Sequence, residues 1–83
     1  MVVTVTKNDI KAGFLHHSFH CPIAKALKRA TKRAVSIGVG YATVYRSESD
    51  RYKNTVYILP DEVVKFIRNF DRGLPVEPFT FTL

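Results

Sequence analysis

Residues 21–34 read CPIAKALKRATKRA, and their spacing predicts an amphipathic helix that begins sharply at Pro22. Proline suits the first helical position because its missing N–H would have no partner there. Apolar residues recur at helical spacing along one side and are Ile23, Leu27, Ala30 and Ala34. We therefore expect a helix that buries this side in a core and presents the other side to solvent or to a ligand.

The other side of this helix is basic. No acid lies between Asp9 and Glu48, and the net charge of the chain is +6. This asymmetry favours an anionic partner, which could be nucleic acid, a nucleotide or an acidic protein surface. The alternative is a solvated face that keeps a small protein soluble. The expected ligand-binding residues are the cations of this helix and of the segments after it: Lys25, Lys28, Arg29, Lys32, Arg33, Arg46, Arg51 and Lys53.

The remaining elements follow from β-branched runs, caps and turn residues. They are a strand over 2–6, a short turn over 9–13 capped by Asn8 or Asp9, a loop over 14–20, a strand over 35–46, a turn over 47–50, a strand over 51–59, a helix over 60–72 and a strand over 76–83. The order β-α-β-β-α-β predicts a single α+β domain over 1–83, with the ferredoxin-like split βαβ fold or a close variant. Another α+β arrangement of the same elements is the alternative.

Three histidines and the single cysteine cluster before the helix, and they are His16, His17, His20 and Cys21. Imidazole and thiolate ligate zinc, so His16, His20 and Cys21 are weak metal candidates; the alternative is a loop with exposed histidines. A thiol at a helix N-terminus can also have a lowered pKa and act as a nucleophile with His17 or His20 as base. The alternative for Cys21 is a small buried capping residue.

Four tyrosines lie on the expected hairpin and are Tyr41, Tyr45, Tyr52 and Tyr57. Aromatic rings among cations suit stacked bases, and the alternative is that the rings pack in the core. Residues 37–44 match part of the RNP1 pattern of RNA-recognition domains through Gly38, Gly40 and Tyr41. No paired carboxylates, phosphate-binding loop or hydrolase motif occurs, so we expect neither an enzyme nor a cofactor.

One cysteine permits no intrachain disulfide, and no apolar run has the length of a membrane span. The N-terminus has no basic segment leading into an apolar one, so no secretory signal is indicated. We expect a cytoplasmic protein without a membrane partner, and self-association into a homo-oligomer is an open alternative.

Two segments, CPIAKALKRA at 21–30 and LPDEVVKFIRNFDRGLPVEPFTFTL at 59–83, resemble a family of small bacteriophage and prophage proteins. The opening VTVTKNDIKAG fits the same pattern. The matching motifs form the fold, and they carry no assigned activity. The resemblance implies a phage accessory protein inside a bacterial cell. Such proteins often modulate or block host machinery, so an inhibitor that docks on an acidic surface of a host defence enzyme is the alternative function.

Overall fold

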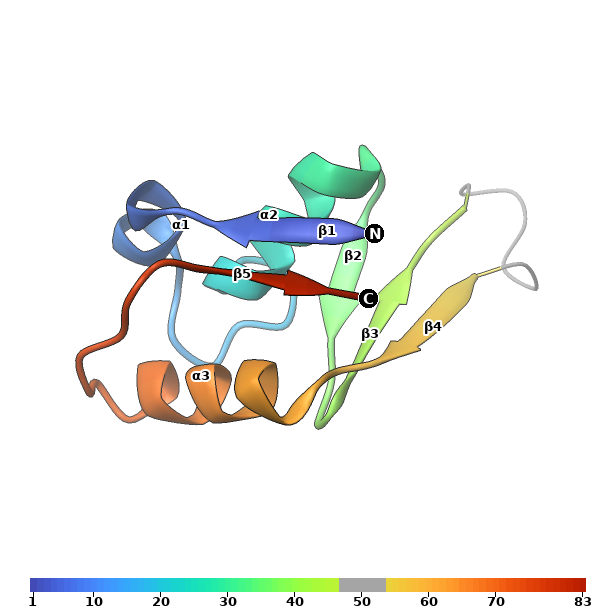
Figure 1. The fold of residues 1–83 in the computed structure, drawn as a ribbon. Helices are drawn as coiled ribbons and strands as arrows, with labels where there is room; N and C mark the ends of the chain where they lie inside the picture. Colours follow the sequence, from blue (N-terminus) through green and yellow to red (C-terminus); the bar gives the residue numbers. More distant parts are fainter. Residues whose placement is uncertain (47–53) are drawn as a thin grey trace.

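The first strand, β1 (Val2–Val5), ends where Thr6 begins a helix. The computed structural model describes residues 1–46 and 54–83, and Figure 1 shows their arrangement. Thr6 caps α1 (Lys7–Ala12): its hydroxyl accepts from the Asp9 N–H, while the Asp9 carboxylate accepts from the Thr6 N–H. This reciprocal pair is a capping box. The expected cap at Asn8 or Asp9 was therefore wrong, and Asp9 instead supplies the returning carboxylate.

The central helix, α2 (Pro22–Thr31), begins as the sequence predicts but ends before Ala34. Cys21 is its N-cap, and the Cys21 sulfur accepts from the Ala24 N–H at 3.5 Å. At the other end Lys32 adopts a left-handed conformation with φ 56°, and its N–H donates to the Lys28 carbonyl. This left-handed residue terminates the helix and redirects the chain.

The early end of α2 changes which residues form its buried side. Ala30 and Ala34 are exposed, so their assignment to the core was wrong. Ile23 and Leu27 are fully buried, as expected. The core-facing residues of α2 are Ile23, Ala24, Ala26 and Leu27. The apolar side is thus confined to the first two turns of the helix.

The segment 35–46 forms two strands rather than the predicted single one, namely β2 (Val35–Ile37) and β3 (Tyr41–Val44). Gly40 has φ +79°, which favours glycine. A Cβ on Gly38 would lie 2.3 Å from the Tyr41 ring, so a side chain at this position would displace that ring. The two glycines therefore make the tight turn between antiparallel β2 and β3.

The remaining elements are β4 (Thr55–Ile58), α3 (Asp61–Asp71) and β5 (Phe79–Thr82). β4 pairs antiparallel with β3, and β5 pairs antiparallel with β1. Each element is shorter than the range that the sequence predicts for it. The expected turn at 47–50 and the start of the expected strand at 51–53 lie outside the described residues.

The described strands form two separate antiparallel sheets, β1-β5 and β2-β3-β4. The single sheet of a ferredoxin-like fold is not seen, so only the coarser expectation of a small α+β domain is confirmed. In Figure 1, α3 runs along one side of the β1-β5 ribbon, and α2 lies behind that ribbon. The loop between α1 and α2 passes between α2 and α3 (Figure 1).

One hydrophobic core joins both sheets to α2 and α3. Its largest fully buried side chains come from β1, β2, α2 and α3, and are Ile23, Leu27, Val3, Val5, Val35, Val63 and Pro22. Among the described residues, no helix has the length and hydropathy needed to cross a bilayer. The shared core implies that the two sheets fold as one unit.

Candidate functional site

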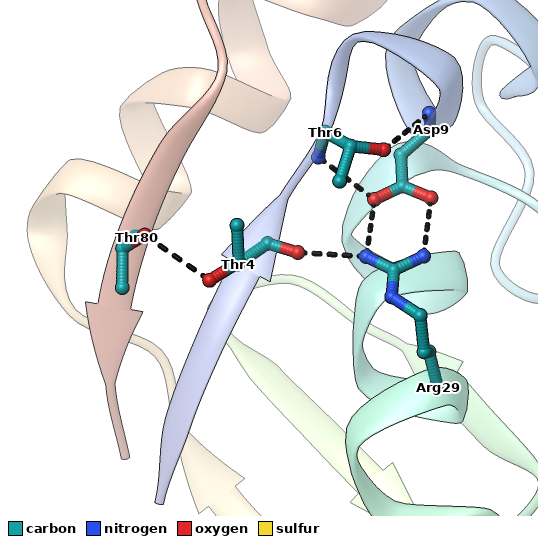
Figure 2. Close-up of polar contacts among 5 residues, drawn as sticks. All are labelled: Thr4, Thr6, Asp9, Arg29 and Thr80. Atoms are coloured by element: carbon teal, nitrogen blue, oxygen red, sulfur yellow. Dashed lines mark hydrogen bonds and ion pairs between the residues drawn. The ribbon is translucent and has the colours of Figure 1, made fainter.

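Arg29 of α2 binds Asp9, although its own side chain stays 51% exposed (Figure 2). Its two terminal nitrogens donate to the two carboxylate oxygens of Asp9 at 2.8 and 2.7 Å. Nη2 also donates to the carbonyl of Thr4 at 2.7 Å, so one guanidinium joins α2, α1 and β1. Such bidentate pairs are stronger and more directional than single hydrogen bonds. Arg29 therefore stabilises the fold by connecting these three elements.

The surroundings of Asp9 explain why a buried carboxylate is tolerated. Asp9 is only 4% exposed. Its hydrogen bonds from Arg29 and Thr6 outweigh the effect of burial and lower the pKa of Asp9 below its usual range. The sequence analysis placed Arg29 among the ligand-binding cations, and this expectation is corrected because Arg29 already has an acidic partner. Asp9, from the first half of the chain, neutralises it.

Lys25 and Lys28 remain as cations that face away from the core. Within residues 1–46 and 54–83, neither lysine forms an ion pair. The Lys28 ammonium donates to the carbonyl of Phe19, which holds this lysine beside the preceding loop. Desolvation, followed by the charges of Lys28, His17 and Lys25, lowers the pKa of His20. The charges of Lys28 and Lys25 are thus felt at His20, as a smaller cause than desolvation.

The loop over 14–20 places aromatic rings beside these lysines. The ring centroids of His17 and His20 are 4.6 Å apart. The centroid of the Phe14 ring lies 5.9 Å from that of His17 and 6.0 Å from that of His20. Phe14 and Phe19 are 59% and 46% exposed. We call this surface the cationic–aromatic patch, and its members are Phe14, His17, Phe19, His20, Lys25 and Lys28.

The patch contains two residues that the sequence analysis missed as ligand-binding residues. Phe14 and Phe19 lie in the loop over 14–20, and both side chains are exposed to solvent. The available signal was their position: two phenylalanines flank His16 and His17, and a third histidine follows, immediately before a basic helix. Aromatic residues interleaved with cations suit bases stacked next to phosphates.

The other expected ligand cations lie beyond the end of α2. Lys32 is the left-handed residue after the helix, and Arg33 donates through Nη1 to the carbonyl of Arg46 at 2.6 Å. These three cations lie after α2 and after β3, and the described contacts of Lys32 and Arg33 are with Lys28 and Arg46. The two remaining candidates, Arg51 and Lys53, lie outside the described residues.

Cys21 has the environment of a structural cap. It is 5% exposed, and burial raises the pKa of the Cys21 thiol, so these observations favour the buried capping residue over the thiolate nucleophile. Among the described residues, no group of three or more His, Cys, Asp or Glu side chains forms a metal site. His16 is drawn instead towards α3, where its backbone N–H donates to the Asp71 carboxylate at 3.0 Å.

The three tyrosines that the structure describes differ in their surroundings. Tyr57 packs against the core, and the Tyr45 hydroxyl lies 3.0 Å from that of Ser36. Tyr41 is 44% exposed but lies on the second sheet, and Tyr52 is outside the described residues. The patch is thus a better candidate than the hairpin.

Searches against protein-family models, curated proteins and solved structures find no match to the chain.

Proposed function

We propose that the chain is a non-enzymatic binding protein for a phosphate-bearing ligand, single-stranded nucleic acid or a nucleotide, and that the ligand binds at the cationic–aromatic patch. The supporting observation is that Lys25 and Lys28, both without a described acidic partner, lie close enough to His20 to affect its charge, while Lys28 contacts the Phe19 carbonyl and the exposed Phe14 ring lies beside His20. Lysines bind phosphates as point charges, and exposed rings accept any base by stacking.

The test is fluorescence anisotropy of a labelled oligothymidine of about twelve nucleotides, titrated at salt concentrations from about 50 to 300 mM. The double variant Lys25→Gln/Lys28→Gln removes two cations of the patch. We expect it to weaken binding and to reduce the slope of log affinity against log salt by about 1.4, or ~0.7 for each phosphate that is no longer neutralised.

Lys7→Gln/Lys65→Gln is the matched control, because both lysines are exposed and lie on α1 and α3. It changes the net charge equally but leaves the patch intact, so its salt slope should follow that of the unaltered protein. Equal loss of affinity in both double variants would show that total charge, rather than the patch, drives binding. Absence of oligonucleotide binding by the unaltered protein would remove the nucleic-acid proposal.

The alternative is an inhibitor that docks on an acidic protein surface, and one observation favours it. Leu15 and Val39 are 53% and 97% exposed, and exposed aliphatic side chains of this kind suit contact with a protein partner. A protein partner captured by the chain should then be lost with Leu15→Ser/Val39→Ser as well as with the Lys25/Lys28 variant. An accessory role in phage infection, including interference with host defence, is part of either proposal and rests on the sequence resemblance.

A further inference from the structure

A hollow of about 400 Å³ lies between the 14–20 loop, the β2–β3 turn and α3. This volume falls in the range of small-ligand sites. The described residues that line it come from these three segments and from the N-cap of α2: His16, His17, Ser18, Cys21, Ile37, Gly38, Val39, Gly40, Val64, Ile67, Arg68 and Asp71. Three separate elements of the fold thus converge on one concave surface.

The lining is apolar in part and polar at a few points. Ile37 and Cys21 are buried, and Val64 and Ile67 are half-buried against the core. The polar groups are on α3 and the loop, where the His16 Nδ1 lies 3.6 Å from the Asp71 carboxylate and Arg68 is exposed. Apolar walls with few polar groups suit a flat ring that carries hydrogen-bonding atoms on its edge.

The loop that closes this hollow is held on both sides. Ser18 accepts through its carbonyl from the Ile37 N–H at 2.9 Å, which fixes the loop to β2. The His16 N–H donates to Asp71, which fixes it to α3. Within the loop, the Phe14 N–H donates to the His20 carbonyl at 2.9 Å. The walls are therefore formed before any ligand arrives, which lowers the entropic cost of binding.

The hollow and the cationic–aromatic patch are continuous through His17 and Cys21. His17 lines the hollow, and its ring is 4.6 Å from that of His20 in the patch. Cys21 also lines the hollow, and Lys25 follows one helical turn later, with its N–H donating to the Cys21 carbonyl. A ligand with an apolar ring and an anionic group can thus occupy both surfaces at once.

We infer that this hollow receives the base of a nucleotide whose phosphate lies on Lys25 and Lys28. The inference rests on the proposed function, because it adds a base-binding position to the phosphate-binding patch. Charge complementarity selects this occupant over an uncharged ring. Lys25 and Lys28 lie on the helix whose N-cap, Cys21, lines the hollow, and they attract an anion, while the apolar part of the walls suits a ring.

The probes are adenosine 5′-monophosphate and ribose 5-phosphate, measured by isothermal titration calorimetry. They share the phosphate and the sugar, so their difference reports the base. We expect the adenosine nucleotide to bind about tenfold more tightly. Ser18→Phe places a ring in the hollow and should remove this advantage without weakening ribose 5-phosphate. Thr80→Phe, an exposed position outside the hollow, is the matched control.

A second measurement uses the unaltered protein and so does not depend on folding of the variants. In ¹H–¹⁵N spectra, the adenosine nucleotide should shift the amides of Gly38, Gly40, Val64 and Ile67, whereas ribose 5-phosphate should not. Equal affinity of the two probes, no nucleotide binding, or shifts confined to the loop and α2 would overturn the base position.

The outcomes separate this inference from the proposed function. In one outcome, oligonucleotide binding depends on Lys25 and Lys28, but Ser18→Phe does not change the affinity for the adenosine nucleotide. This outcome would overturn the base position and keep the phosphate-binding patch. If Lys25→Gln/Lys28→Gln leaves the binding of all phosphate-bearing probes unchanged, the patch itself is rejected.

Discussion

Arg29 and Lys25 are both cations of α2, but only Arg29 has an acidic partner among the described residues. Arg29 binds a carboxylate that is almost completely buried and a strand carbonyl. Lys25 has no ion pair among the residues that the structure describes. A change at Arg29 should therefore affect stability, whereas a change at Lys25 should affect ligand binding.

Arg29→Gln should lower the free energy of unfolding by roughly 1–3 kcal/mol, because it leaves the Asp9 carboxylate buried with fewer donors. Chemical denaturation measures this change. Lys25→Gln on the same helix is the control and should stay within about 0.5 kcal/mol of the unaltered protein. Equal effects of the two variants would show that Arg29 acts only as a surface charge.

The same pair predicts how stability depends on pH. The pKa of Asp9 is lower in the folded protein than in the unfolded chain. Its contribution is therefore present above the unfolded pKa, about 3.9, and is lost as the pH falls through the folded pKa. In Arg29→Gln, melting temperatures should fall less between neutral and acidic pH. Parallel pH profiles of the two proteins would contradict this linkage.

His20 predicts the pH dependence of ligand binding. Its pKa is lowered in the free protein by desolvation and by Lys28, His17 and Lys25. A bound phosphate would offset these positive charges and raise the pKa of His20, so binding takes up protons and affinity rises as the pH falls. Oligonucleotide titrations between about pH 7.5 and 5.5 measure this. His20→Gln should flatten the profile, and an unchanged profile would exclude His20 from the patch.

At this scale the sequence predicted the types of residue in the site better than their partners. Lys25 and Lys28 were expected as ligand cations, and the structure leaves both outside any described ion pair. Asp9 and Arg29 are separated by 20 positions, and no local pattern links them. Their pairing depends on how α1 packs against α2, which is a matter of tertiary structure.

At the scale of the elements, α2 shows what local pattern can and cannot define. Its start was predictable, because Pro22 and the preceding Cys21 are local signals. Its end was not, because Lys32 takes a left-handed conformation that the spacing of charges does not reveal. The same holds for 35–46, where alternation predicted one strand and Gly38 and Gly40 make a turn instead.

Lys32→Gly should stabilise the protein by roughly 0.5–1 kcal/mol, because glycine adopts the left-handed conformation without steric cost. Lys32→Ala removes the same charge but keeps a Cβ, so it should not stabilise the fold. Thermal melts of both variants test this. A gain in Lys32→Ala as large as in Lys32→Gly would assign the effect to charge rather than to backbone conformation.

At the scale of the whole molecule, the sequence predicted the α+β class. It did not predict the helix α1, the separation of 35–46 into β2 and β3, or the division into two sheets. Val3 and Phe81 from one sheet and Val35 and Ala42 from the other belong to the same core. Element order alone does not state which edges pair. In this structure β2, β3 and β4 pair with one another, and β1 pairs only with β5 among the described strands.

Phe81→Ala should destabilise the protein by about 3–5 kcal/mol, because the Phe81 side chain is only 2% exposed. The loss should lower the stability of both sheets together, since they share one core. Hydrogen exchange at Val3 in β1 and Ala42 in β3 measures this, with exposed Thr82→Ala as the control. Retained protection in β3 while β1 opens would show that the sheets unfold independently.

The Arg29–Asp9 pair should also couple substitutions at positions 9 and 29 during evolution. A lineage that loses the arginine first must carry a buried acid with fewer donors, and one that loses the aspartate first disrupts a helix cap as well. Positions 9 and 29 should therefore change jointly or persist jointly. Covariation of these two positions would mark relatives that share this packing even where the remaining sequence has drifted.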